Sequence, residues 1–191
     1  MTHVTIVASL IPSTAPTAAG AALARDFTWP DEPACAALAH ELAQTLRDGL
    51  LAGGSAYIEL HGTLGAGKTT FTRHLLRALG VQGRIKSPSY AVVEQHDVPG
   101  MVIQHFDFYR FNDPQEWEDA GFRDLFAAPG LKLAEWPDKA EGLLPRPDLS
   151  IHIQPLGEDT RQVKMAAFST IGRQALNALQ PVQDVGVPSH G

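Results

Sequence analysis

The stretch HGTLGAGKTT, residues 61–70, constrains the fold of this chain more than any other. It satisfies the pattern G-x-x-x-x-G-K-[ST], whose defining positions here are Gly62, Gly67, Lys68 and Thr69. Glycines let successive backbone N–H groups point into one concavity that can hold phosphate oxygens, and Gly65 adds further freedom inside the turn. A helix that starts at this point brings its positive end to the same place. The stretch therefore predicts a phosphate-binding loop, or P-loop.

The flanking sequence supplies the context that this motif requires. YIELH, residues 57–61, is a short run that leads straight into the loop, and KTTFTRHLLRALG, residues 68–80, follows with apolar residues at helical spacing. A glycine-rich turn that matches by chance is the alternative, but the order strand, turn and helix favours nucleotide binding. Lys68 would then reach the β- and γ-phosphates, and the Thr69 hydroxyl would ligate Mg²⁺.

The other periodic segments predict an α/β domain. An amphipathic helix is expected over residues 34–54, where leucines recur every four positions after an acidic start. The predicted strands are YAVVEQH (90–96), MVIQHFDFY (101–109), LKLAEW (131–136), LSIHIQPL (149–156) and RQVKMAAFS (161–169). Two pairs of these strands flank turn sequences and read as hairpins. One strand-to-helix crossover plus hairpins indicates a three-layer P-loop NTPase-like domain with a mixed parallel and antiparallel sheet.

Composition limits the domain organisation and the partners. Residues 1–25 are rich in Ala, Thr and Pro and predict a flexible extension, residues 26–179 form the expected domain, and residues 180–191 predict a flexible tail. The chain is 44% hydrophobic and 19% charged, which is typical of globular proteins. Its formal net charge of -6 argues against direct, tight binding of nucleic acid, because phosphate neutralisation needs clustered Lys and Arg.

Several other classes of site and location are excluded or disfavoured. The single cysteine, Cys35, rules out an internal disulfide and a Cys-rich zinc site, and His61, His74, His96 and His105 match no zinc spacing. The sequence has no apolar run long enough to span a membrane, and its start has no basic segment typical of a secretory signal. A reducing, cytoplasmic location is expected.

Hydrolysis or phosphoryl transfer needs a carboxylate near the metal, and the sequence offers two candidates. Asp107 and Glu135 each lie at the end of a predicted buried strand, where the ligands of α/β sheets gather. The alternative for either is a solvated strand end. A guanine-reading N-K-x-D is absent, and DVPG at 97–100 reads better as a hairpin turn than as the D-x-x-G of GTPases. ATP is therefore the expected nucleotide.

The remaining peptides are more specific. HGTLGAGKTTFTRHLLRALG, KSPSYAVVEQH, HFDFYR, GFRDLF and AEWPDKAEGLLP occur in this order between Phe27 and about Ser169. In these stretches the chain resembles the TsaE family, also called YjeE, the small P-loop ATPases that bacteria use with TsaB and TsaD to make threonylcarbamoyladenosine in tRNA. The resemblance implies ATP and Mg²⁺ as cofactors, TsaB and TsaD as partners, and contact with tRNA only through them.

The resemblance also implies roles for individual residues. The nucleotide contacts implied are Cys35, Gly62, Leu64, Gly65, Ala66, Gly67, Lys68, Thr69, Thr70 and Trp136. Thr69 and Glu135 would hold Mg²⁺, and Asp107 with Lys68 would serve hydrolysis. Ser87, Pro88 and Ser89 match a segment that behaves as a switch loop, although an ordinary Ser-Pro turn is the alternative. Trp136 has packing as its alternative role, and His105 is open between a structural and a functional one.

One position departs from the family pattern. Cys35 stands where the family usually has a threonine that helps to hold the nucleotide, and a thiol is the weaker hydrogen-bond donor.

The preferred hypothesis is an ATPase that resets or regulates TsaD and carries no transfer chemistry itself. A small-molecule kinase is the main rival, but its expected lid, residues 110–126, is acidic and has only Arg110 and Arg123. A nucleotide-controlled scaffold with negligible hydrolysis is a third possibility. Aromatic residues at 117, 122 and 126 suggest a partner surface, with core packing as the alternative.

Overall fold

The computed structural model describes residues 23–180, so most of the predicted extension and nearly all of the predicted tail lie outside the described residues. In chain order the elements are β1 (Leu23–Trp29), α1 (Glu32–Leu51), β2 (Ser55–His61), α2 (Lys68–Leu79), β3 (Val93–Val98), β4 (Met101–Asp107), α3 (Pro114–Asp119), α4 (Phe122–Ala127), β5 (Gly130–Glu135), the 3₁₀ turn η1 (Pro137–Ala140), β6 (Leu149–Pro155), β7 (Arg161–Ala167) and α5 (Thr170–Ala178). None of the helices in this range is long and apolar enough to cross a membrane.

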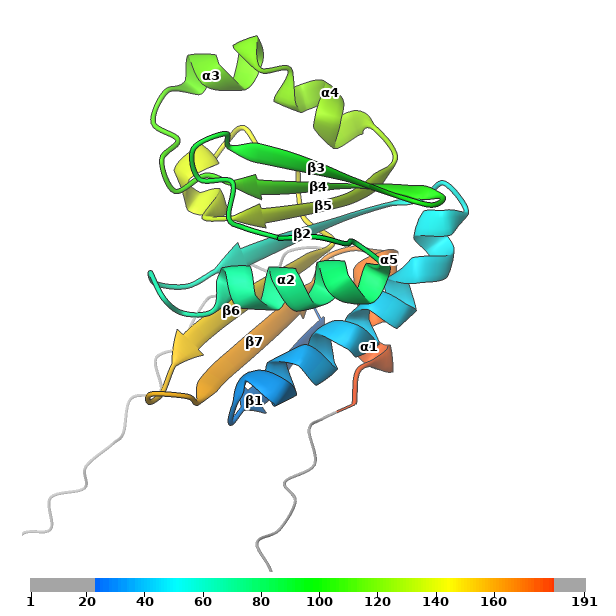
Figure 1. The fold of residues 1–191 in the computed structure, drawn as a ribbon, viewed down its shortest axis with the longest axis vertical. Helices are drawn as coiled ribbons and strands as arrows, with labels where there is room; N and C mark the ends of the chain where they lie inside the picture. Colours follow the sequence, from blue (N-terminus) through cyan, green and yellow to red (C-terminus); the bar gives the residue numbers. More distant parts are fainter. Residues whose placement is uncertain (1–22, 181–191) are drawn as a thin grey trace, which may run out of the picture.

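The strands form one seven-stranded mixed sheet in the order β1-β7-β6-β2-β5-β4-β3 (Figure 1). β2 lies at its centre, parallel to β5 on one side and to β6 on the other, and β4 is parallel to β5. The hairpins β3–β4 and β6–β7 are antiparallel, and β1 pairs antiparallel with β7. The predicted mixed sheet and both predicted hairpins are confirmed, and in the DVPG stretch Pro99 and Gly100 form the two-residue turn between the paired residues Val98 and Met101.

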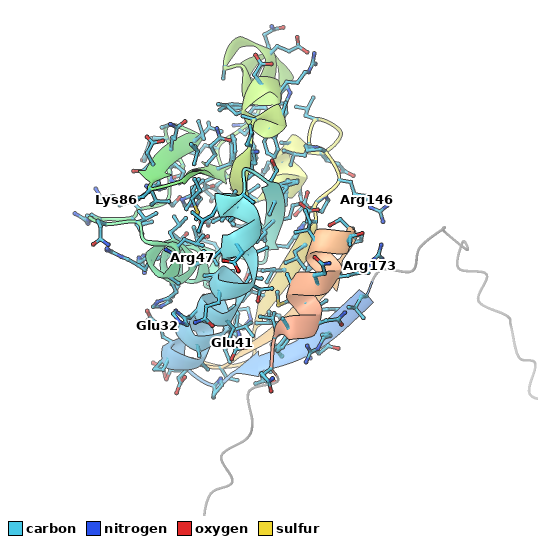
Figure 2. The ribbon with its side chains drawn as sticks, turned by 90° about the vertical axis from the view of Figure 1, so that its right-hand side faces the viewer. Glu32, Glu41, Arg47, Lys86, Arg146 and Arg173 are labelled. Atoms are coloured by element: carbon cyan, nitrogen blue, oxygen red, sulfur yellow. The ribbon has the colours of Figure 1, made fainter. Side chains whose placement is uncertain are left out.

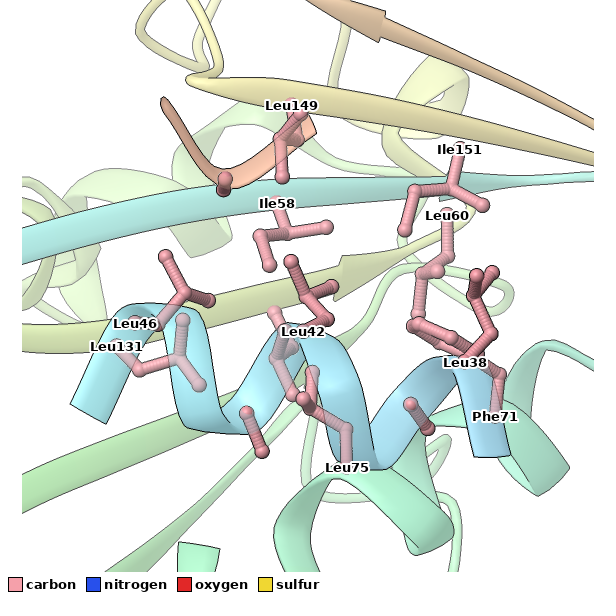
Figure 3. Packing of buried hydrophobic residues seen from close by; sticks show 14 of the residues in the cluster. Leu38, Leu42, Leu46, Ile58, Leu60, Phe71, Leu75, Leu131, Leu149 and Ile151 are labelled. Atoms are coloured by element: carbon pink, nitrogen blue, oxygen red, sulfur yellow. The ribbon is translucent and has the colours of Figure 1, made fainter. Parts of the chain in front are cut away.

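Helix α1 follows from a cap and a leucine stripe. The Asp31 side chain accepts a hydrogen bond from the Ala34 backbone N–H at 2.9 Å, which starts the helix. Leu42 and its neighbours in the stripe are buried and point toward Ile58 and Leu60 of β2, as Figure 3 shows. This stripe fixes the helix over the centre of the sheet.

Side chains pack into a core on each face of the sheet. One cluster joins α1, α2 and α5 to the sheet, and the other joins α3 and α4 to the opposite face, over β3, β4 and β5 (Figure 1). Trp117 and Phe122 belong to the second cluster and are each 3% exposed. The suggestion of a partner surface at these two residues is therefore wrong, because their rings fill the core.

The third layer covers only part of the sheet. On the side away from α1, the outward-facing residues of β1, β7 and β6 are exposed, among them Asp26, Gln162, Lys164 and Gln154. These residues line a shallow hollow of about 510 Å³.

Strand β1 and helix α5 were not predicted from the sequence. Strand β1 is the first described element and includes residues 23–25, which the sequence assigned to the extension. The Arg25 guanidinium on this strand donates to the carbonyls of Leu176 and Leu179 at 2.8 and 2.7 Å, and so ties β1 to the end of α5. Ser169 caps α5, which lies beside α1 (Figure 2). The antiparallel pairing of β1 with β7 spans most of the chain, so no local pattern reveals it.

Leu42→Ala tests the α1 packing, with Leu51→Ala on the same helix as a matched control. Leu42 is fully buried and Leu51 is 44% exposed. We expect Leu42→Ala to lower the free energy of unfolding by about 2–5 kcal/mol, because a cavity remains in the core, and Leu51→Ala to change it by less than about 0.5 kcal/mol. Urea unfolding measures both, and equal losses would contradict this packing.

Candidate functional site

Three neighbouring strands end at the same edge of the sheet, and the site lies there. Leu60 on β2 is in register with Glu135 on β5, which is in turn in register with Asp107 on β4. The P-loop leaves this edge directly after β2. The pairing therefore brings the loop and both candidate carboxylates together, although Asp107 and Glu135 are 28 positions apart in the sequence.

The loop backbone needs glycine at two positions. Gly62 has a φ of +142°, and a Cβ there would lie 2.4 Å from the Ile153 carbonyl oxygen. Gly67 is the N-cap of α2 with a φ of 111°, and no side chain caps the helix. The N–H groups of the first turn of α2 are consequently available to an anion rather than to a side-chain oxygen.

Lys68 is folded back onto its own loop. Its Nζ donates to the carbonyls of Gly62 and Thr63 at 2.7 and 2.9 Å. The same ammonium lies 3.8 Å from the centroid of the Trp136 ring, a cation–π contact. Burial lowers the pKa of Lys68, and the nearby carboxylates of Glu135 and Asp107 oppose that shift. Trp136 thus has a definite place at the head of η1, beside the P-loop lysine.

Glu135 is held by two side chains. Its Oε2 accepts from the Thr69 hydroxyl at 2.8 Å, and its Oε1 lies 2.9 Å from His105 Nε2. Glu135 and His105 are buried, with exposures of 1% and 0%. A hydroxyl and a carboxylate oxygen that already face each other are the ligand types that Mg²⁺ prefers. Thr69 and Glu135 therefore fit the metal role.

Asp107 is held in a similar way by the segment that contains the predicted switch. The Ser87 hydroxyl donates to Asp107 Oδ2, and the Tyr109 backbone N–H donates to Oδ1 at 2.9 Å. Asp107 is 4% exposed. The Pro88 carbonyl accepts a hydrogen bond from the Val92 backbone N–H at 2.7 Å, which closes the turn that follows Ser87.

These groups share one cavity of about 340 Å³. Its lining residues are Leu64, Gly65, Ala66, Gly67, Lys68, Thr69, Thr70, Ser87, Ser89, Asp107, Tyr109, Arg110, Glu135 and Trp136. Tyr109 and Arg110 were not assigned from the sequence, although they lie only two and three residues after Asp107. Gly62 and Pro88 do not line the cavity. Their carbonyls accept hydrogen bonds from Lys68 Nζ and from the Val92 N–H, respectively. Leu64 is 74% exposed, at the rim.

A second cavity of about 160 Å³ adjoins the first across the P-loop and holds Cys35. It is lined by Trp29, Asp31, Glu32, Cys35, Gly65, Ala66, Gly67, Thr70, Asp159 and Arg161. Cys35 is 3% exposed, and burial together with the nearby Glu32 raises the pKa of its thiol to about 12. The structure therefore places Cys35 in a different cavity from Asp107 and Glu135.

Arg161 is a site residue that the sequence did not reveal. Its Nε donates to the carbonyl of Ala66 in the P-loop at 3.0 Å, and its Nη1 donates to the Glu158 carbonyl at 2.9 Å. The guanidinium thus joins the loop to the β6–β7 turn. Of the histidines, His74 pairs with Glu32 at 2.9 Å, and no group of three or more His, Cys, Asp or Glu within residues 23–180 could hold a metal.

Comparison with known proteins identifies the family. The family model described as threonylcarbamoyl adenosine biosynthesis protein TsaE matches residues 29–163. The chain belongs to the TsaE family. A TsaE protein of Haemophilus influenzae is 41% identical over 121 residues, which cover 63% of this chain and 76% of that protein. A TsaE protein of Bacillus subtilis is 36% identical over 117 residues, which cover 61% and 71%.

A solved structure agrees with the fold. The crystal structure of YdiB from Bacillus subtilis superposes with a TM-score of 0.65, covering 83% of this chain and 95% of that one at 23% identity. The predicted α/β fold of the P-loop type and the predicted TsaE membership are thus confirmed. The TsaE family takes part in the biosynthesis of threonylcarbamoyladenosine in tRNA, and so this chain has a place in that process.

Thiol labelling tests the environment of Cys35, the only cysteine in the chain. With a pKa of about 12, the thiol is about one part in ten thousand ionised at pH 8, against about a quarter for an ordinary cysteine. We expect Ellman's reagent to react with the folded chain at pH 8 at least about a hundredfold more slowly than with the urea-unfolded chain. Similar rates in both states would mean that the second cavity is open to solvent.

Proposed function

We propose that this chain is a Mg²⁺-dependent ATPase that works with TsaB and TsaD in forming threonylcarbamoyladenosine in tRNA. The observation that carries the proposal is the meeting of an uncapped P-loop helix, Thr69, Glu135 and Asp107 around one cavity. These are the parts that phosphoryl-transfer sites need: an anion cradle, ligands for a cation, and a carboxylate for water.

The phosphates would be held mainly by backbone. The first-turn N–H groups of α2 and the concave loop before them supply donors and the positive end of the helix dipole. Lys68 would leave the carbonyls of Gly62 and Thr63 and move its ammonium to the β- and γ-phosphates. The move would replace two neutral carbonyl acceptors of the loop with anionic phosphate oxygens. Anionic acceptors bind an ammonium more strongly than neutral ones.

Thr69 and Glu135 would hold the cation. Their oxygens already lie 2.8 Å apart and face the cavity, so little rearrangement is needed. Bound Mg²⁺ would neutralise the charge that develops on the phosphoryl oxygens.

Asp107 would order the attacking water and accept its proton as the water oxygen attacks the γ-phosphorus and ADP leaves. One of its oxygens is occupied by Ser87. A γ-phosphate that draws the Ser87 hydroxyl toward itself would free that oxygen for water, and hydrolysis would let Ser87 return. The 87–89 segment would then report on the nucleotide, as a switch does.

The output of this cycle would be control of TsaD. The acidic chain, with a formal net charge of -6, is unsuited to hold tRNA by itself. We therefore propose that the chain binds TsaB and TsaD in the cytoplasm, resets or regulates TsaD through ATP binding and hydrolysis, and meets tRNA through these partners.

A small-molecule kinase is the less favoured candidate. Its lid would need arginines that close over the phosphates. Of the two arginines in residues 110–126, Arg110 lines the cavity and stacks on Tyr90 at 4.5 Å, whereas Arg123 pairs with Glu118 on the surface. The segment itself contains α3 and most of α4, and its residues Phe111, Trp117 and Phe122 pack into the core.

Lys68→Ala and Asp107→Asn separate binding from hydrolysis. We expect Lys68→Ala to weaken ATP binding at least about tenfold, because it removes a charge-assisted contact to the phosphates. Asp107→Asn should leave the Kd within about threefold and lower turnover by about 10²–10⁴-fold. Calorimetry gives the Kd, and phosphate release gives turnover. If Asp107→Asn supported modification of tRNA fully while Lys68→Ala abolished it, the nucleotide-controlled scaffold would replace the ATPase.

ATP turnover with and without TsaB and TsaD tests the partners. We expect the two proteins together to stimulate release of free phosphate, and either one alone to have little effect. γ-labelled ATP should yield labelled inorganic phosphate. Label on a metabolite would instead favour the kinase, and an absence of stimulation by the pair would count against control of TsaD.

A further inference from the structure

His105 is placed beside Glu135 by the register of the sheet. It lies on β4 two residues before Asp107, so both side chains leave the same face of the strand. Asp107 is in register with Glu135, and His105 is in register with Leu133. His105 is therefore the diagonal neighbour of Glu135, and its Nε2 reaches Glu135 Oε1 at 2.9 Å.

The contact indicates which ring nitrogen of His105 is the donor. A carboxylate oxygen only accepts, so Nε2 carries the hydrogen and donates it to Oε1. The other ring nitrogen, Nδ1, is buried and has no hydrogen-bond partner. The ring thus makes one polar contact with a described residue, and that contact is to Glu135.

The residue facing the ring on β3 is the half-buried Glu94, which makes no hydrogen bond with it. The other strand neighbours are apolar: the preceding inward residue on β4 is Ile103, and the facing residue on β5 is Leu133, both fully buried. A leucine would suit such neighbours and would avoid an unpaired ring nitrogen. The imidazole is explained instead by Oε1, which would be buried without a partner if His105 were apolar.

The two oxygens of Glu135 consequently have separate partners. Thr69 faces Oε2 and His105 holds Oε1, so the carboxylate plane is fixed from two different elements, α2 and β4. We infer that His105 is a positioning residue that keeps Oε2 of Glu135 turned toward Thr69, ready for a divalent cation. The inference rests on the proposed function, because it assumes that Thr69 and Glu135 hold Mg²⁺. Partners that fix a ligating carboxylate commonly change metal affinity by about 10–100-fold.

Two amide variants provide a matched test. In His105→Gln the amide nitrogen takes the place of Nε2 and can still donate to Oε1. In His105→Asn the chemistry is the same, but the shorter side chain does not reach. His105→Leu removes the donor while keeping the bulk, and Glu135→Gln serves as a variant that lacks the metal carboxylate.

The measurement is the Kd of a non-hydrolysable ATP analogue for the full chain, in Mg²⁺ and in EDTA. We expect Mg²⁺ to tighten binding to the wild type and to His105→Gln. The tightening should fall by about 10–100-fold in His105→Asn and His105→Leu, with the Kd in EDTA within about twofold of the wild type. A purely structural role would move urea stability but not the ratio of the two Kd values.

The possible failures are distinct. If His105→Asn keeps the tightening seen in the wild type, the positioning role is wrong and the proposed metal site stands. If the wild type and Glu135→Gln respond equally to Mg²⁺, the metal site itself is wrong, and the inference fails with it. Should His105→Leu not fold, the comparison of His105→Gln with His105→Asn decides alone.

Discussion

The parallel register of β2, β5 and β4 is the constraint on which the rest of this site depends. It places Glu135 and Asp107 in line beside the last residues of β2, at the point where the P-loop begins. The cores on both faces hold that register, because shifting any of these strands by one residue would turn its buried side chains to the opposite face. The core packing that stabilises the fold therefore also fixes how far the P-loop, the Thr69 hydroxyl and the carboxylates of Glu135 and Asp107 lie from one another.

The polar groups gathered at this edge satisfy one another. Lys68 uses loop carbonyls, Glu135 uses Thr69 and His105, and Asp107 uses Ser87 and a backbone N–H. Each buried group would otherwise be costly to leave unpaired. A ligand at this site therefore competes with existing partners, so binding is an exchange of contacts. Such an exchange naturally couples the ligand to the segments that carry the displaced partners, above all to the turn that carries Ser87.

Sequence reasoning reached the parts of this site that are local. The P-loop is ten consecutive residues whose glycines are required by their own backbone, and Asp107 and Glu135 end strands with recognisable patterns. The hairpins follow from turns between adjacent strands. The contact of His105 with Glu135 needs the β4–β5 register, and that of Arg161 with Ala66 spans 95 residues. Strand β1 likewise pairs with β7, far away in the sequence. A short stretch of sequence therefore cannot show which residues make these contacts.

The two cavities also differ in whether their walls come from consecutive residues or from residues distant in the sequence. This difference matters for Cys35, which stands where the family usually has a threonine. The phosphate side of the P-loop is made of consecutive backbone groups, so few side-chain changes alter it. The second cavity is built from side chains of β1, α1 and the β6–β7 turn, which meet only in the folded chain. A buried thiol with a raised pKa is a neutral, weak donor there. If a nucleotide reaches this cavity, a thiol in place of a hydroxyl would weaken only the contact on the far side of the loop and would leave the phosphate side unchanged, because Arg161 fixes the loop there through the Ala66 carbonyl.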